Sequence, residues 1–298
     1  MPARPTAQDF DQELLILFDA YVHGTIDRRG FLERAQRFAT AAMSAGALLT
    51  ALSPNFALGQ QVAKDDERIT TALLSYPSTS GTGTVNGYLA KPANISDKLP
   101  SVLVIHENRG LNPHIEDITR RLALAGYMAF APDALTPLGG YPGDEDKARE
   151  LFAKLDQKKA TEDFVAGVTF LSGQPEGNGK TGVVGFCYGG GMVHTLTTRL
   201  PELHAGVPFY GNLPAAGDAV KVKTPLLAHF AAQDERINAA WPAYEAALKA
   251  ANVPYTAHQY AGTQHGFNND TTPRYDAQAA KLAWRRTMTF FGETLKTT

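Results

Sequence analysis

Short apolar runs alternate with amphipathic stretches from about residue 65 to the end of the chain. The runs have the length of buried strands, and the stretches between them repeat their apolar positions at helical spacing. We expect strands at residues 69–76, 84–90, 100–106, 127–131, 181–186, 204–209, 225–230 and 255–260. We expect helices at residues 115–125, 144–171, 241–250 and 275–295. This alternation predicts an α/β fold, in which helices cover both faces of a mostly parallel sheet.

The first sixty residues have a different pattern. Residues 8–37 place apolar side chains at helical spacing, and residues 38–63 contain no charged side chain at all. We therefore divide the chain into an N-terminal helical segment, residues 1–59, and an α/β domain, residues 60–298.

Composition narrows the possible partners. The 298 residues include 28 basic and 30 acidic side chains, a net charge of -2, so nothing in the charge balance favours binding to nucleic acid. A single cysteine excludes an internal disulfide and leaves the cellular compartment open.

That single cysteine, Cys187, lies in the most informative stretch of the chain. It follows the expected strand 181–186, precedes a helical pattern, and has Gly185 two residues before it and Gly189 two residues after it. This is the pattern of a nucleophile elbow, a strained strand-to-helix turn that needs small flanking residues. A lone cysteine is more often a small core residue, but a core position would not require this arrangement of glycines. We interpret Cys187 as a nucleophile whose thiolate is favoured at a helix N-terminus.

Two later strand ends supply the partners that a thiol nucleophile needs. Asp234 follows the strand 225–230, and His265 follows the strand 255–260. The order Cys187, Asp234, His265 is the nucleophile, acid, histidine order of α/β-hydrolases. His265 would accept the thiol proton and later activate water, while Asp234 would orient its imidazole. Taken singly, Asp234 could instead cap a helix and His265 could be a structural loop histidine.

The other histidines fit a catalytic role less well. His194 lies in the elbow helix, His229 and His258 lie within strands, and His23 lies in the N-terminal segment. Since the eight histidines show no ligand-type spacing and there is no second cysteine, we expect neither a metal site nor a cofactor.

These residues resemble the dienelactone hydrolases, or carboxymethylenebutenolidases, over about residues 69–295. The resemblance rests on Gly-Phe-Cys-Tyr-Gly-Gly around Cys187, on Asp234, on His265 in His-Gly-Phe, and on Glu107 after the strand 100–106. It implies an eight-stranded α/β-hydrolase sheet without a large lid domain, and hydrolysis of an ester or enol-lactone through a cysteinyl thioester. It also implies an oxyanion hole made by the backbone N–H groups of Asn108 and Tyr188.

The resemblance gives Glu107 the role of a carboxylate that contacts the resting thiol. A carboxylate at this position opposes a second negative charge, so it would hold Cys187 neutral until substrate disturbs the pair. The alternative is that Glu107 simply pairs with Arg109 or Arg120.

The chain departs from the family pattern at two positions. Family members that act on dienelactone carry arginines for its carboxylate where this chain has Pro137 and Asn269. Arg109 or Arg274 could replace them, although neither matches the motif. The natural substrate is therefore left open.

Two rival functions are weighed against the ester hydrolase. A glutamine amidotransferase also uses a cysteine elbow, but it places a glutamate two residues after its histidine, and Phe267 stands there in this chain. A non-catalytic binding or assembly protein on the same scaffold would have an inert Cys187.

The N-terminal segment resembles a twin-arginine export signal. Arg28 and Arg29 precede a moderately apolar, uncharged run, and small residues two apart allow cleavage after Gly59. We expect export to the periplasm, with residues 28–59 contacting the export machinery, and no stable membrane span because the apolar run is short. Residues 1–37, however, carry five basic and six acidic side chains, where an export signal usually has a positive charge. The alternative is a retained pair of amphipathic helices, packed on the catalytic domain or a second subunit of a cytoplasmic protein.

Overall fold

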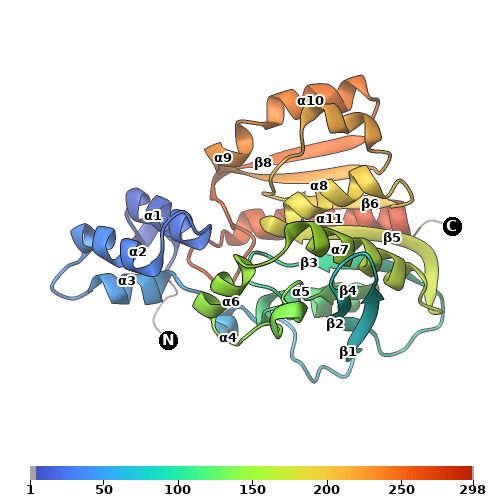
Figure 1. Ribbon diagram of the computed structural model, residues 1–298, viewed down its shortest axis with the longest axis horizontal. Coiled ribbons are helices and arrows are strands. Elements are labelled where there is room, and N and C mark those ends of the chain that lie inside the picture. Colours follow the sequence, from blue (N-terminus) through green and yellow to red (C-terminus); the bar gives the residue numbers. More distant parts are fainter. Residues whose placement is uncertain (1–4, 297–298) are drawn as a thin grey trace.

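A computed structural model describes residues 5–296 as a single eight-stranded sheet flanked by helices (Figure 1). The strand order is β1-β2-β4-β3-β5-β6-β7-β8. Pairing is antiparallel from β1 to β2 and from β2 to β4, and parallel between all later neighbours. The strands are β1 (Ile69–Ser78), β2 (Gly83–Pro92), β3 (Leu99–Ile105), β4 (Met128–Pro132), β5 (Gly177–Phe186), β6 (Ala205–Phe209), β7 (Leu226–Gln233) and β8 (Tyr255–Gln264).

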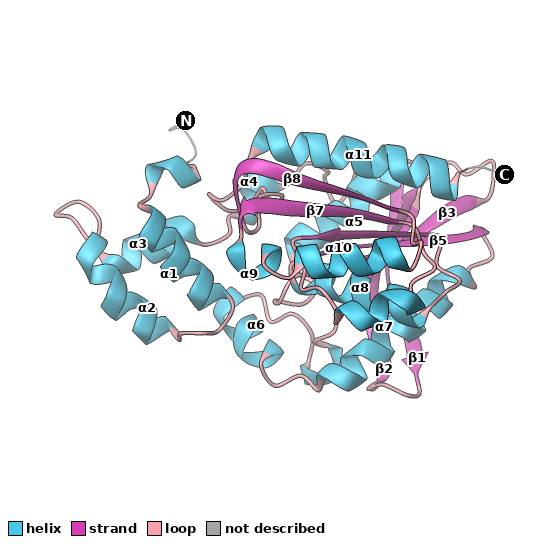
Figure 2. Ribbon diagram, turned by 90° about the horizontal axis from the view of Figure 1, so that it is seen from above, coloured by secondary structure: helices cyan, strands magenta, loops and turns pink. Residues whose placement is uncertain are grey.

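Helices cover both faces of this sheet, as Figure 2 shows. The helices of the α/β domain are α5 (Pro113–Leu124), α6 (Glu145–Phe152), α7 (Gln157–Ser172), α8 (Tyr188–Arg199), α9 (Glu235–Asn238), α10 (Trp241–Ala250) and α11 (Ala277–Leu295). Alternate side chains of β3 enter different cores: Val102 and Val104 pack with residues of α5 and α11, while Leu103 and Ile105 pack with residues of α7 and α8. Because successive side chains of a strand point to opposite faces, the apolar residues of β3 contribute to the cores on both sides of the sheet.

The expected fold is confirmed, and each of the eight expected strands is present. The helical stretch expected at residues 144–171 consists of two helices, α6 and α7. Asp156 begins the second helix, α7, where its carboxylate accepts hydrogen bonds from the amides of Lys158 and Lys159.

The N-terminal segment folds into a lobe of its own beside the sheet (Figures 1 and 2). Its helices are α1 (Gln12–Val22), α2 (Arg28–Ala35) and α3 (Ala45–Leu52). Their inward faces form a separate apolar core that includes Leu14, Phe18, Phe31 and Leu49. The single turn α4 (Phe56–Gly59) follows the lobe and lies against the α/β domain, where the amide of Asn55 donates to the carbonyl oxygen of Thr271 at 2.7 Å. None of the helices within residues 5–296 is long and apolar enough to cross a membrane.

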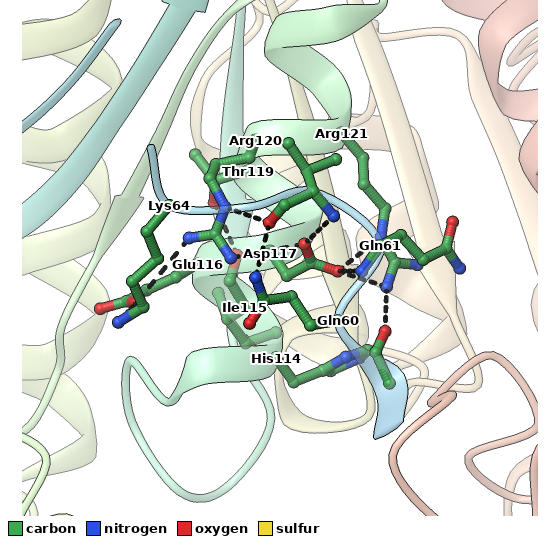
Figure 3. A network of polar contacts seen from close by, with 12 residues as sticks. Gln60, Gln61, Lys64, His114, Ile115, Glu116, Asp117, Thr119, Arg120 and Arg121 are labelled. Carbon is green, nitrogen blue, oxygen red and sulfur yellow. Dashed lines mark hydrogen bonds and ion pairs between the residues drawn. The ribbon is translucent and has the colours of Figure 1, made fainter. Parts of the chain in front are cut away.

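A polar network fastens the chain to α5 directly after this lobe (Figure 3). The buried carboxylate of Asp117 accepts hydrogen bonds from the backbone amides of Gln61, at 3.0 Å, and Val62, at 2.9 Å. Arg121 pairs with Asp117 and donates to the carbonyl oxygen of Gly59 at 3.0 Å. These contacts hold residues 59–62 against the α/β domain.

Candidate active site

Cys187 lies on a sharp turn between β5 and α8, with the unusual backbone angles φ 55° and ψ -111°. The two flanking glycines are required there by close backbone contacts. A Cβ on Gly185 would lie 2.2 Å from the carbonyl oxygen of Gly189, and a Cβ on Gly189 would lie 2.2 Å from that of Ile105. The strained turn directs the thiol toward the carboxyl edge of the sheet, as expected for a nucleophile elbow.

Asp234 and His265 meet at this same edge. Asp234 directly follows β7 and His265 directly follows β8, and the parallel pairing of the two strands brings them together. His265 Nδ1 lies 2.6 Å from Asp234 Oδ2, and both side chains are buried. The other carboxylate oxygen of Asp234 accepts from the amide of Ile237 at 3.4 Å, so this residue also begins α9. Asp234 therefore caps α9 with one carboxylate oxygen and contacts His265 with the other.

A second histidine contacts the thiol, and it comes from the N-terminal lobe. His23, at the end of α1, places Nε2 3.4 Å from Cys187 Sγ. Its Nδ1 lies 2.9 Å from the backbone oxygen of Asp19 and 3.2 Å from that residue's carboxylate. Sγ and one ring nitrogen each of His23 and His265 lie within 4.8 Å of one another, the one group among residues 5–296 that could hold a metal ion.

The two imidazoles change the acidity of the thiol. Burial opposes ionisation of Cys187, but the positive charges of His265 and His23 outweigh it and lower the thiol pKa to about 6. Burial also opposes the charged form of each imidazole, and the thiolate outweighs it. The thiolate and the hydrogen bond to Asp19 together raise the pKa of His23 to about 10. The thiolate and the hydrogen bond to Asp234 together raise the pKa of His265 to about 9. The site therefore favours a thiolate facing imidazolium at neutral pH.

Glu107 lies close by but is held by Asn269. Asn269 Nδ2 donates to Glu107 Oε2 at 2.8 Å. No ion pair within residues 5–296 joins Glu107 to Arg109 or Arg120. Arg109 instead faces Glu145 at 3.8 Å, and Arg120 faces Asp117 at 3.4 Å.

Both candidate substrate-binding arginines border the site and contact the N-terminal lobe. Arg109 donates to the carbonyl oxygen of Val22 at 3.3 Å, and the side chain of Asn108 donates to the same oxygen at 2.8 Å. Arg274 pairs with Asp19 at 3.0 Å, and its guanidinium lies 5.3 Å from the ring centre of Phe18. Pro137, in contrast, lies in a short 3-10 turn after β4.

Two hollows adjoin this constellation. A groove of about 560 Å³ runs between α1 and the ends of β7 and β8, and its walls include Asp19, Asp234, His265 and Arg274. A much smaller cavity, of about 50 Å³, lies against Glu107, Arg109, Asn269 and the other side of Arg274. Only the groove has the volume of an ordinary small-molecule site.

The backbone amides expected to form the oxyanion hole flank the nucleophile. Tyr188 is the first residue of α8, so its N–H has no acceptor inside the helix and is available at the elbow. Asn108 lies in the loop after β3, and the elbow reaches that strand because Gly189 packs against the backbone of Ile105.

The structure thus gathers Cys187, Asp234, His265, Glu107, Asn108, Tyr188, Arg109 and Arg274 around one edge of the sheet. His23 was set aside in the sequence because it lies in the N-terminal segment, and its position beside the thiol corrects that judgement. The amphipathic face of α1 indicated only that this helix needs a partner. Nothing in its spacing identified Cys187, 164 residues away, as that partner.

The sheet order, the cysteine elbow and the parallel strand ends define an α/β-hydrolase. More specifically, the chain belongs to the dienelactone hydrolase family, whose family model matches residues 85–295. A separate family model, described as YqhI-like, matches residues 1–40, so the N-terminal lobe has a sequence signature of its own.

Comparisons with individual proteins agree with this assignment. A putative carboxymethylenebutenolidase from Escherichia coli is 31% identical, over 76% of this chain and 88% of its own length. A putative hydrolase fragment, YghX, from the same organism is 55% identical over 38% of this chain and 97% of its own length. The crystal structure of a putative dienelactone hydrolase from Klebsiella pneumoniae superposes with a TM-score of 0.67 at 28% identity, covering 76% of this chain and 99% of that one.

Proposed function

We propose that this hydrolase cleaves an ester or enol-lactone through a thioester on Cys187, with His265 and Asp234 as base and orienting acid. The observation that carries the proposal is the Asp234–His265 pair at 2.6 Å, directed at the elbow that presents the thiol. The lowered pKa of Cys187, about 6, supports a thiolate that is ready to attack at neutral pH.

The steps follow from these positions. The thiolate attacks the carbonyl carbon, and the developing oxyanion is stabilised by the amides of Tyr188 and Asn108. Collapse of the intermediate breaks the carbon–oxygen bond and leaves the acyl group on sulfur, and the departing oxygen takes the proton that the thiol had given to imidazole and leaves as the alcohol. His265 then removes a proton from water, whose oxygen attacks the thioester and frees Cys187.

The substrate class is a small ester or lactone that fits the groove of about 560 Å³ beside α1. Arg274 lines this groove and Arg109 lines the smaller cavity beside it, so these two cations are our candidates for binding a carboxylate on that substrate, although neither matches the family motif. No metal or cofactor is required for these steps.

The deciding experiment compares the parent protein with Cys187→Ala on a chromogenic short-chain ester. We expect turnover by the parent, loss of turnover in the variant, and a mass increase equal to the acyl group when the parent is quenched during the reaction. A protein that turns over no ester and alkylates slowly at Cys187 would instead be the non-catalytic binding protein considered above.

Export by a twin-arginine route stays a separate proposal, resting on Arg28, Arg29 and the uncharged run that follows. The alternative, in which the N-terminal segment is not cleaved, is supported by the packing of the lobe. Arg28 pairs with Asp146 at 2.6 Å, and His23 contacts Cys187. N-terminal sequencing of protein from the native host distinguishes them: export with cleavage predicts a start near Gln60, and retention predicts a start at the beginning of the chain.

A further inference from the structure

Two aspartate–histidine pairs converge on one sulfur atom. Asp234 orients His265 from the strand ends of the α/β domain, and Asp19 orients His23 from α1. In each pair the carboxylate lies at Nδ1. Nε2 of His23 lies 3.4 Å from Cys187 Sγ, and Nε2 of His265 is buried and makes no hydrogen bond within residues 5–296. A hydrolase of this fold needs only one such pair, so the second requires its own explanation.

We propose that His23 is a catalytic residue, a second acid–base group that keeps the proton of Cys187 and gives it to the leaving oxygen of the substrate. The inference rests on the proposed nucleophilic role of Cys187. It makes the N-terminal lobe a part of the active site rather than an appendage.

The contacts of the lobe fit a positioning role better than simple obstruction. A segment that only blocked the thiol would need no carboxylate to orient its imidazole. Here Asp19 binds His23 and is itself held by Arg274 at 3.0 Å, while the carbonyl oxygen of Val22, the preceding residue, is held by Asn108 and Arg109. Arg274, which lines the groove, and Asn108 and Arg109, which line the smaller cavity, thus fix where His23 Nε2 lies.

Each proton in the proposed reaction has a donor and an acceptor. At rest the thiol proton is on His23, and Cys187 is a thiolate. Attack forms the carbon–sulfur bond, the carbon–oxygen bond of the ester breaks, and the departing oxygen takes the proton from His23 Nε2. Acylation removes the thiolate charge that favours the imidazolium form, so His265 releases its proton to solvent and becomes neutral. It then accepts a proton from water as the water oxygen attacks the thioester, and the carbon–sulfur bond breaks to restore the thiolate. The carboxylic acid gives its proton to His23, so one ester and one water yield an alcohol, a carboxylate and one proton in solvent.

The preference of the proton for His23 agrees with the groups around it. Asp19 and the Cys187 thiolate favour its charged form, while His265, Arg236 at 3.4 Å and Arg274 beyond Asp19 are the cations that face the same space. The thiolate raises the pKa of both imidazoles, and the distance of 3.4 Å from His23 Nε2 to Cys187 Sγ places His23 to hold the thiol proton.

The test uses the full chain and two esters of one acid that differ only in the leaving group. A nitrophenolate leaves without a proton, whereas an alkoxide needs one. We expect His23→Gln to lower turnover of the alkyl ester by about 100-fold and of the nitrophenyl ester by less than about 10-fold. His258→Gln, a partly buried histidine of β8 away from the site, is the matched control and should change neither.

A second readout does not depend on turnover. The pH midpoint of Cys187 alkylation by iodoacetamide should rise by about one unit or more in His23→Gln, because one of the two charges that favour the thiolate is gone. Asp19→Asn should show the same leaving-group pattern to a smaller degree, and it serves if His23→Gln does not fold.

Three results would overturn the inference: equal losses on both esters, a gain in turnover, which would make the lobe an obstruction, or an unchanged alkylation midpoint. Failure of the proposed function has a different signature. In that case Cys187→Ala would hydrolyse both esters as well as the parent does.

Discussion

Asn269 donates a hydrogen bond of 2.8 Å to Glu107, and so a residue that replaces a family arginine binds the family glutamate. The amide of Asn269 thus orients the carboxylate of Glu107, and the hydrogen-bond partner of the thiol is His23.

Removing that donor should change the acidity of the thiol. In Asn269→Ala, Glu107 loses its hydrogen bond and can turn toward Cys187, where a second negative charge opposes the thiolate. We expect the alkylation midpoint of Cys187 to rise above its value of about 6. Asn86→Ala, an exposed position on β2, is the control, and a midpoint that stays the same in both variants would show that Asn269 does not restrain Glu107.

The pH dependence of turnover follows from the shifted groups. The thiol has a lowered pKa of about 6, so activity should be absent well below pH 6 and should appear as the pH rises through that value. His265 and His23 have raised pKa values of about 9 and about 10, so the imidazolium proton, and activity on alkyl esters, should be lost as the pH rises through that range. A rising limb near pH 9, the ordinary thiol range, would contradict the thiolate–imidazolium pair.

Asp234 should matter mainly through His265. Asp234→Asn keeps the size of the side chain but weakens the hydrogen bond that orients the ring and that adds to the effect of the thiolate in raising the pKa of His265. We expect kcat to fall by about 100-fold or more, with the thioester accumulating because water is no longer activated efficiently. Quenched-flow mass spectrometry measures the acyl-enzyme directly. Asp218→Asn, in the remote turn before β7, should leave kcat unchanged.

Arg274 offers a test of the substrate class, since it lines both hollows at the site. If it binds a substrate carboxylate, Arg274→Met should raise KM for an ester that carries a second carboxylate by about 10-fold or more relative to a neutral ester of the same length. An equal change for both esters would mean that the residue only holds Asp19 and the lobe.

The elbow glycines set a limit on substitution. Gly189→Ala would place a Cβ 2.2 Å from the carbonyl oxygen of Ile105, and backbone cannot yield as a flexible side chain can. We expect a loss of stability of about 1–3 kcal/mol or more, despite the better helix propensity of alanine. Gly217→Ala, where no atom lies within 4 Å of the added Cβ, should be close to neutral in thermal unfolding.

The sequence by itself determined the sheet and the order of the principal site residues. Buried strands appear as apolar runs, and the elbow appears as glycines around Cys187, because these features come from local backbone geometry. Asp234 and His265 could be placed beside Cys187 because parallel strands bring their carboxyl ends to one edge.

Only the tertiary structure decided which side chains face the sulfur. His23 reaches Cys187 through the docking of a separately cored lobe, and Asn269 reaches Glu107 across the site; single contacts of this kind leave no periodic signal in either segment. The pattern of α1 shows that one face must be buried, whereas the surface that buries it, and thus the second histidine at the nucleophile, depends on the packing of two distant parts of the chain.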